Sequence, residues 1–303
     1  MAHGDFPSQR SHIFIDPLGF QLPSTCASDC VIWFEAMTPQ DISFHPAVNV
    51  LYANEDGMVA VEKPTGIRSH PNNSKDHTST LIRADYDFDK ECYHWLNANG
   101  QISRCWLINR LDSPTSGILL VALNERVSQV VKQQFAQHQV RKTYYALVRN
   151  RPHTERGIWE DIIPKHANYR PAHHPQTIRA QTKFRLLASS QSDPTISLLE
   201  LCPITGRTHQ LRRQCQQHGC PILGDQTYGD FQFNRSMQKK TALKRLFLHA
   251  ARIQIQYKID AKERSLDVDC PRPQSFDLVL GHNQAKVPIK QSLKLPNRRF
   301  KRP

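Results

Sequence analysis

The sequence lacks the motifs of several large enzyme classes. Its 303 residues contain no G-x-x-x-x-G-K-[ST], no G-x-G-x-x-G, no G-x-S-x-G and no H-E-x-x-H. These motifs are typical of nucleotide hydrolysis, dinucleotide binding, serine hydrolysis and zinc proteolysis. The sequence therefore gives no support to any of these four chemistries.

Cysteine is present, but not in the patterns that indicate a scaffold or a metal site. Eight cysteines are too dilute for a disulfide scaffold in a chain of this length, and no C-x-x-C pair occurs. Cys215, His218 and Cys220 lie close together, which allows a metal-site hypothesis, but Cys215 also fits the buried side of a helix. We therefore favour reduced, buried thiols and expect no metal.

Long apolar runs are absent as well. No stretch approaches the roughly 18 apolar residues that a membrane span needs, and the first 20 residues show no secretory signal pattern. We therefore expect a cytoplasmic protein without a membrane contact, and we expect it to be a monomer.

What the chain has in excess is positive charge. Its formal net charge is +13 and its isoelectric point is near 9.5. Such a protein attracts phosphate backbones and other polyanions. A nucleic acid is therefore one candidate partner, and the alternative is that the charge serves solubility alone.

The order of the patterns along the chain predicts one domain with two extensions. Residues 1–45 look like an N-terminal arm, residues 46–280 like a single domain, and residues 281–303 like a basic tail. Strands and helices are mixed without a strict βαβ rhythm, which favours an α+β fold.

Individual elements can be assigned within that domain. We expect strands that include 50–52, 58–61, 118–123, 143–149, 195–204 and 247–255. Asn124 should cap a helix that ends near His138, and a second helix should run from near Thr208 to Gly219. The polar stretch at 72–89 reads as a loop that leads into another helix.

Three dense polar segments are the candidates for chemistry. The first is N-R-L-D-S-P-T-S-G at 109–117, which places Asp112 on a loop directly before a buried strand. A catalytic carboxylate needs such a rigid support. The alternative is a plain turn in which Asp112 bonds to nearby backbone amides.

The second and third segments carry aromatic and cationic side chains. In R-K-T-Y-Y-A at 141–146, strand alternation sends Tyr144 and Tyr145 to opposite faces, so one can pack in the core while the other lines a cleft. G-R-T-H-Q-L-R at 206–212 puts two arginines and a histidine at a helix start, where an anion can bind. A solvated basic helix end is the alternative.

Together these segments resemble the RluA-type family of pseudouridine synthases. The family patterns are approximately H-R-L-D-x-x-T-S-G, K-x-Y-x-A, and G-R-T-H-Q-[IL]-R with G-x-P-I-[LI]-G-D-x-x-Y-G. The K-P-T-G block at 63–66 and L-F-L-H-A at 246–250 also match, so the resemblance covers about residues 48–272. The one departure is Asn109, where the family usually has histidine.

The resemblance implies a fold, a reaction and a set of site residues. The fold would be a central, mixed but largely antiparallel sheet with flanking helices and a cleft, and the family uses no cofactor. Asp112 would be the catalytic carboxylate, Tyr144 would stack on the target uracil, and Arg212 would pair with the aspartate. Around them we expect RNA contacts from Asn109, Arg110, Lys142, Arg207 and His209, with Asn109 positioning its loop rather than transferring protons.

The predicted reaction is the isomerisation of specific uridines to pseudouridine in structured ribosomal or transfer RNA. The reaction takes up no atom or electron from a second reactant. The absence of nucleotide-binding and metal-binding motifs is therefore consistent with it. The rival hypothesis is a non-catalytic RNA-binding protein that has kept the fold. The intact Asp112, Tyr144 and Arg212 argue against that rival.

Overall fold

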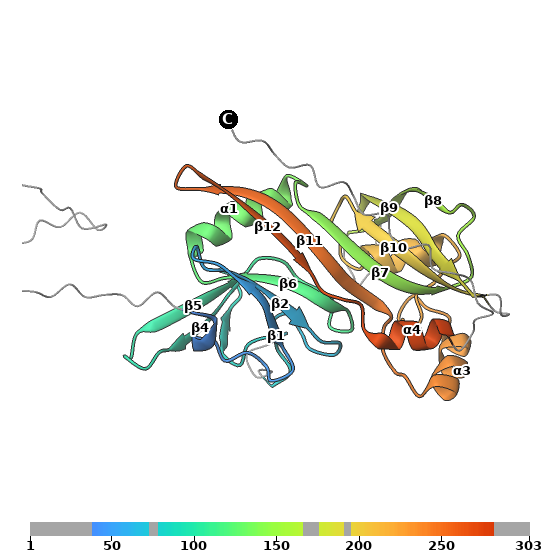
Figure 1. Cartoon of the computed structure of the whole chain (residues 1–303), viewed down its shortest axis with the longest axis horizontal. Helices are drawn as coiled ribbons and strands as arrows, with labels where there is room; N and C mark the ends of the chain where they lie inside the picture. The colour runs from blue at the N-terminus through green and yellow to red at the C-terminus, as the bar shows by residue number, and fades with distance from the viewer. Residues whose placement is uncertain (1–37, 73–77, 166–175, 191–194, 282–303) are drawn as a thin grey trace, which may run out of the picture. The chain divides into compact units, whose positions relative to one another are not determined.

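The computed structural model describes residues 38–72, 78–165, 176–190 and 195–281 (Figure 1). The expected N-terminal arm up to residue 37 and the expected tail from residue 282 lie outside this part. Residues 38–45 contain a short 3-10 helix, η1 (Pro39–Asp41), and Ile42, which is buried in the core. None of the helices in the described segments is long and apolar enough to cross a membrane.

Twelve strands and four α-helices make up the described part of the chain. The strands of the N-terminal half are β1 (Asn49–Ala53), β2 (Met58–Lys63), β3 (Asp85–Asp87), β4 (Cys92–Leu96), β5 (Ile102–Leu107) and β6 (Ser116–Ala122). The strands of the C-terminal half are β7 (Arg141–Arg149), β8 (Arg156–Pro164), β9 (Thr177–Ser189), β10 (Ile196–Pro203), β11 (Leu248–Ile259) and β12 (Lys262–Asp269). The helices are α1 (Glu125–Ala136), α2 (Gln210–Gln217), α3 (Phe231–Thr241) and α4 (Gln274–Gly281).

All twelve strands join one mixed sheet. Its main path is β3-β4-β5-β6-β11-β7-β10-β9-β8, with β2 and β1 attached to β6 and with β12 attached to β11. Among the described strands, β6 and β11 form the one parallel pair, and the other pairs are antiparallel. This is the largely antiparallel α+β arrangement that the sequence predicted.

The strand β6 lies at the centre of the N-terminal half, and all seven of its residues are buried. Ile118 and Leu120 pack in the same cluster as Val127 of α1, which lies against β11 and β12 (Figure 1). Leu119 and Val121 point to the opposite face. Burial on both faces explains why the sequence of this strand is a continuous apolar run.

The C-terminal half also has helices on both faces of the sheet. Leu199 of β10 packs with Leu211 of α2, whereas its neighbour Leu198 packs with Phe276 of α4. The helix α2 ends as predicted, because Gly219 follows it with a left-handed φ of 69°. The cap of α1 is also confirmed, since the side chain of Asn124 accepts hydrogen bonds from two amides of its first turn.

The expectation of a helix after residues 72–89 is wrong. The chain instead forms β3 and then a hairpin of β4 and β5. The side chain of Asn97 accepts hydrogen bonds from the amides of Asn99 and Gln101, and Gly100 has a left-handed φ of 73°. The Asn99-Gly100 dipeptide between two aromatic runs is the local signal for this hairpin.

The two halves of the sheet meet where β6 runs alongside β11, at the pairs Ser116–His249 and Gly117–Ala250. Gly117 has a φ of 111°, and a Cβ atom there would lie 2.2 Å from the carbonyl oxygen of Ala250. The close approach of the two strands therefore requires glycine at position 117.

A buried histidine, His249, forms hydrogen bonds at the same junction of β6 and β11. The Nε2 atom of His249 lies 3.1 Å from the carbonyl oxygen of Cys270, so this nitrogen carries the proton. Its Nδ1 atom is then free to accept a hydrogen bond from the hydroxyl of Ser116, at 2.9 Å. Burial lowers the pKa of His249, which favours this neutral form.

Replacing Gly117 with alanine should lower the free energy of unfolding by about 2–5 kcal/mol, because it combines a disfavoured φ with overpacking. The matched control is Gly100→Ala, which also has a positive φ but has no atom within 4 Å of the added Cβ. The control should lose about 1–2 kcal/mol. Urea unfolding followed by circular dichroism measures both, and equal losses would show that the β6–β11 contact is not tight.

Candidate active site

The loop between β5 and β6, residues 108–115, carries Asp112 to the junction of the two halves of the sheet. The buried hydroxyl of Ser69 donates to the carbonyl oxygen of Leu111 (2.9 Å) and accepts from the amide of the same residue (3.1 Å). The amide of Thr115 donates to the carbonyl oxygen of Asp112 at 2.9 Å and closes a turn. The backbone of Asp112 is therefore held on both sides.

A buried lysine holds the other end of this loop. The ammonium of Lys63 donates hydrogen bonds to the carbonyl oxygens of Pro64 (3.0 Å), Ile67 (2.7 Å) and Ser113 (3.1 Å). Burial lowers the pKa of Lys63 to about 7, although the charge of Asp112 opposes this shift. Through the bond to Ser113, the K-P-T-G block at 63–66 thus holds the loop that carries Asp112 in place.

Asn109 attaches the start of the loop to β6. Its Oδ1 atom accepts a hydrogen bond from the amide of Leu120 at 2.8 Å, next to the bond from the amide of Ile108 to the carbonyl oxygen of Leu120. The side chain thereby extends the pairing between β5 and β6 by one bond. This contact has the positioning character that the sequence suggested, while an RNA contact from Asn109 stays a prediction.

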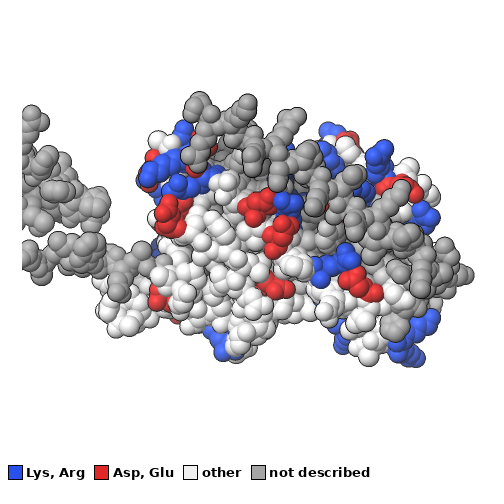
Figure 2. All heavy atoms as spheres, viewed as in Figure 1, with Lys and Arg blue, Asp and Glu red and all other residues white. Residues whose placement is uncertain are grey.

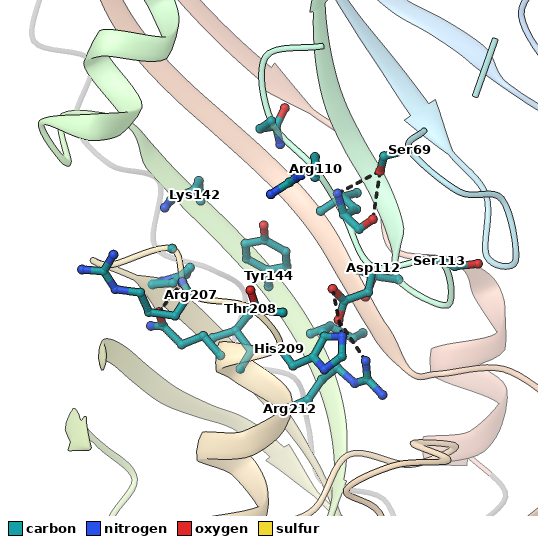
Figure 3. Close-up of a pocket in the computed structure, with 18 of the residues that line it drawn as sticks. Ser69, Arg110, Asp112, Ser113, Lys142, Tyr144, Arg207, Thr208, His209 and Arg212 are labelled. Carbon is teal, nitrogen blue, oxygen red and sulfur yellow. Dashed lines mark hydrogen bonds and ion pairs between the residues drawn. The ribbon is translucent and has the colours of Figure 1, made fainter. Parts of the chain in front are cut away.

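Arg212, on α2, lies between two carboxylates. Its Nη1 atom donates to Asp112 at 3.0 Å (Figure 3). Its Nε and Nη2 atoms donate to Asp225 at 2.7 and 2.9 Å. Burial alone would lower the pKa of Arg212, but the hydrogen bonds and charges of Asp225 and Asp112 raise it overall. The guanidinium is therefore a permanent cation with a fixed orientation.

Asp225 is a site residue to which the sequence assigned no role. It is almost fully buried, and its carboxylate also accepts hydrogen bonds from the amides of Thr227 (2.8 Å) and Tyr228 (3.0 Å). Burial acts to raise the pKa of Asp225, but Arg212 and these amides lower it overall. The G-D-x-x-Y-G block contained the signal, since an aspartate in a tight turn can bind its own backbone.

The two neighbouring tyrosines of β7 lie on opposite faces, as predicted. Tyr144 lines the cleft that contains Asp112, and Tyr145 packs near the cluster of α3 and α4 on the other side of the sheet. The ring of Tyr144 lies between Lys142 and Asp112 in Figure 3. Burial, followed by the charge of Asp112, raises the pKa of Tyr144, so its hydroxyl stays protonated.

His209 stands beside Asp112 at the start of α2. Its backbone is left-handed, with φ of 54°, and its Nε2 atom lies 3.8 Å from Oδ1 of Asp112. Its Nδ1 atom lies 3.0 Å from the hydroxyl of Tyr228, which also accepts a hydrogen bond from Nε of Arg213 at 3.0 Å. Burial lowers the pKa of His209 against the opposing charge of Asp112, which favours the neutral ring at neutral pH.

The three cations that the sequence predicted to contact RNA, Arg110, Lys142 and Arg207, lie along the cleft. Burial lowers the pKa of Lys142 to about 8, so it is still mostly protonated at pH 7. Arg207 donates from Nε to the carbonyl oxygen of Arg179 at 3.4 Å, and the largely exposed Arg110 lies 4.0 Å from Glu91. All three line the cleft together with Asn109 and His209, so the structure brings together every residue expected to contact RNA.

The cleft has a volume of about 660 Å³ and is lined by both polar and apolar side chains. Among the described residues that line it, Asp112 has the one carboxylate, which is partly exposed and lies near the fixed cation of Arg212 and the aromatic ring of Tyr144. Such an arrangement suits a nucleophile or base acting on a flat, neutral ring system next to a phosphate.

The alternative metal hypothesis gains no support from the described residues. Cys215 and Cys220 are buried, and Nε2 of His218 lies 3.1 Å from the carboxylate of Asp161. The His218 ring stacks on Trp159 with centroids 4.6 Å apart. No group of three metal-ligating side chains occurs in the described segments.

Comparison with known proteins now places this site in a family. The family model of RNA pseudouridylate synthases matches residues 57–217, more than half of the chain. The tRNA pseudouridine synthase C of Haemophilus ducreyi is 34% identical over 67% of this chain and 83% of its own. That of Pectobacterium carotovorum is 33% identical over 75% of this chain, but the match spans just 60% of its length. The ribosomal large subunit pseudouridine synthase C of Vibrio cholerae is 35% identical over 54% of this chain and 51% of its own.

Two solved human structures share the fold. RNA pseudouridylate synthase domain containing 1 has a TM-score of 0.55 at 23% identity and covers 80% of this chain and 90% of its own. RNA pseudouridylate synthase domain containing 4 has a TM-score of 0.53 at 24% identity, over 77% and 92% of the two chains. The fold class predicted from the sequence is confirmed. From the five sequence blocks, the sheet that unites them and these matches, the chain belongs to the RNA pseudouridylate synthase family.

Proposed function

We propose that this protein isomerises specific uridines to pseudouridine in structured RNA, with Asp112 as the catalytic carboxylate. The observation that carries the proposal is the fixed position of Asp112. Its carboxylate faces a cleft that Tyr144 and several cations also line, and it is bonded to the buried Arg212. We further propose that the protein acts as a monomer in the cytoplasm and that it needs no cofactor.

The reaction balances within the substrate. The bond from ribose carbon 1′ to uracil nitrogen 1 breaks, the base turns, and a bond forms from carbon 1′ to uracil carbon 5. The hydrogen on carbon 5 leaves as a proton, and nitrogen 1 gains one. Asp112 supplies the carboxylate for this exchange, and Arg212 and the Ser69 and Lys63 contacts hold it in place.

The target uridine must leave the RNA stack to reach Asp112. Tyr144 offers an aromatic surface beside the carboxylate, and stacking on such a ring contributes about 1–3 kcal/mol per base. Because its hydroxyl stays protonated, the ring does not add a negative charge next to Asp112. We propose that Arg110, Lys142, Arg207 and His209 contact the RNA around the extruded base.

Transfer RNA and ribosomal RNA are the two substrate classes that the names of the relatives suggest. Pseudouridine mapping of total RNA from cells with and without the gene tests the function and identifies the substrate. A site that disappears without the gene and returns with the wild-type gene supports the proposal. An unchanged pseudouridine map would contradict it and would favour the non-catalytic RNA-binding alternative.

Asp112→Asn should lower the single-turnover rate by at least about a thousandfold, equivalent to roughly 4 kcal/mol of barrier. The amide keeps the size of the side chain but lacks the reactive carboxylate. The assay is tritium release from RNA labelled at uracil carbon 5, since each turnover frees that hydrogen. RNA affinity and the unfolding midpoint should stay close to wild type. Turnover within tenfold of wild type would exclude Asp112 as the catalytic residue.

Arg212→Leu should abolish measurable turnover and should also destabilise the fold by about 3–5 kcal/mol, because it leaves the buried Asp225 without its cation. Arg212→Lys should recover part of the activity, since an ammonium cannot donate to both carboxylates in the same planar geometry. The control is Arg213→Leu, which removes a neighbouring buried arginine that contacts Tyr228 and Pro164. If this control lost as much activity per folded molecule, the pairing of Arg212 with Asp112 would not explain the defect.

Asn109→Ala should cost about 1–3 kcal/mol of stability, because it leaves the buried amide of Leu120 without an acceptor, and it should slow turnover. Asn109→His should keep a rate within about tenfold of the parent near pH 8, a difference of roughly 1.4 kcal/mol in barrier. A neutral imidazole can accept the same bond, but protonation below about pH 6.5 removes that acceptor. Single-turnover rates from pH 6 to 8 should therefore fall toward low pH in the histidine variant. A wild-type rate for the alanine variant across this range would leave Asn109 without a role in the site.

A further inference from the structure

A second groove, of about 760 Å³, lies on the other side of the Asp112 loop. Its walls come from residues 65–66 and 113–114, the turn at 223–227, the helix α3 and residues 243–247. Ser113 and Arg212 line both this groove and the active-site cleft. In Figure 3 Ser113 lies at the far end of the cleft from Lys142 and Arg207, which is where the groove begins. The groove therefore adjoins the active-site cleft at Ser113 and Arg212.

One face of α3 forms a wall of the groove. Phe231, Arg235 and Gln238 follow each other at helical spacing and all line it, whereas Lys239 and Lys240 do not. Phe231 is 54% exposed, which is unusual for a large aromatic side chain. Its ring adds an open aromatic surface to a groove whose lining is mostly apolar, with Arg235, Lys244 and Arg245 among its cations.

The groove carries positive charge that the described residues do not neutralise. Arg235 and Lys244 are exposed, and no carboxylate in the described part of the chain forms an ion pair with either. Arg245 donates to the hydroxyl of Ser116 at 2.6 Å and to the carbonyl oxygen of Leu246 at 3.2 Å, again without a carboxylate there. Figure 2 shows Lys and Arg side chains at the end of the molecule where Figure 1 places α3. The charge of this wall suits a phosphate backbone.

The groove is also fixed relative to Asp112. The side chain of Asn234 donates to the carbonyl oxygen of Asp225 at 3.0 Å and accepts from the amide of Gly224 at 2.9 Å. Asp225 in turn holds Arg212, which holds Asp112. A ligand on α3 is therefore at a set distance and angle from the catalytic carboxylate.

We propose that this groove binds the RNA strand that continues from the target uridine. Arg235 and Lys244 contact its phosphates, and Phe231 stacks on one of its bases. The inference rests on the proposed function for the identity of the ligand. It adds a binding surface outside the cleft, which would fix the direction in which the strand leaves the active site.

The test compares two double variants of the full-length protein with equal changes in net charge. Arg235→Gln/Lys244→Gln alters the groove, and Lys239→Gln/Lys240→Gln alters the same region outside it. The probe is a fluorescently labelled, unmodified tRNA transcript, which serves because phosphate contacts do not depend on sequence. Fluorescence anisotropy over a salt series gives the affinity and its salt dependence, and circular dichroism confirms that both variants fold.

The groove variant should bind at least about tenfold more weakly than wild type at low salt. The slope of log affinity against log salt should become shallower by about 1.4–1.8, the value for two lost phosphate contacts. The outer variant should change the slope by less than half as much. Phe231→Ala should weaken binding about tenfold with an unchanged slope, because stacking releases no counterions.

Equal effects of the two double variants on RNA affinity would mean that RNA responds only to the overall positive charge of the protein. The proposal would then be wrong. A groove variant that binds like wild type would also overturn it and would point to a partner other than RNA. Tritium release by the wild-type enzyme is measured on the RNA from the mapping experiment. Failure there contradicts the proposed function, whereas an active enzyme with an unaffected groove variant contradicts the groove alone.

Discussion

The buried guanidinium of Arg212 joins its own helix to the turn that follows it and to a loop 100 residues earlier in the sequence. It donates to Asp112 on the loop before β6 and to Asp225 in the turn after α2, and it belongs to α2 itself. Removing a charge from water is costly unless it is paired and hydrogen-bonded. Arg212 meets that condition because Asp225 accepts hydrogen bonds from two of its nitrogen atoms. The third nitrogen, Nη1, is thereby held toward Asp112.

The two aspartates that pair with Arg212 differ in burial and therefore in role. Asp225 is almost fully buried and receives further hydrogen bonds from backbone amides, so it serves as the structural anion. Asp112 is partly exposed and lines the cleft. The catalytic role that we propose for Asp112 needs both a fixed orientation and access to substrate, and the shared arginine supplies the first without closing off the second.

The sheet provides the frame in which these segments can meet. The strand β6 changes partners along its length, pairing with β5 at one end and with β11 at the other. The loop that carries Asp112 enters β6 at the β11 end, where Gly117 and His249 hold the two halves of the sheet together. The cleft lies beside the β11 end of β6, since Thr115, directly before β6, and Leu248 of β11 both line it.

The sequence by itself determined the family, the buried strand β6, the capped helix α1 and the positions of Asp112, Tyr144 and Arg212. Each of these depends on a contiguous pattern: an apolar run, a capping residue before a periodic stretch, or a motif of fewer than a dozen residues. The hairpin of β4 and β5 was within reach of the same reasoning through Asn99-Gly100, but the polar stretch at 72–89 before it was interpreted as a loop that leads into a helix. Only the tertiary structure decided which segments contact one another. These contacts are the buried pairing of Arg212 with Asp225, the hydrogen bonds of Lys63 and Ser69 to the loop that carries Asp112, and those that form the groove along α3. They require side chains more than ten residues apart to come within hydrogen-bonding distance, and a linear pattern does not specify which distant partners the fold will bring together.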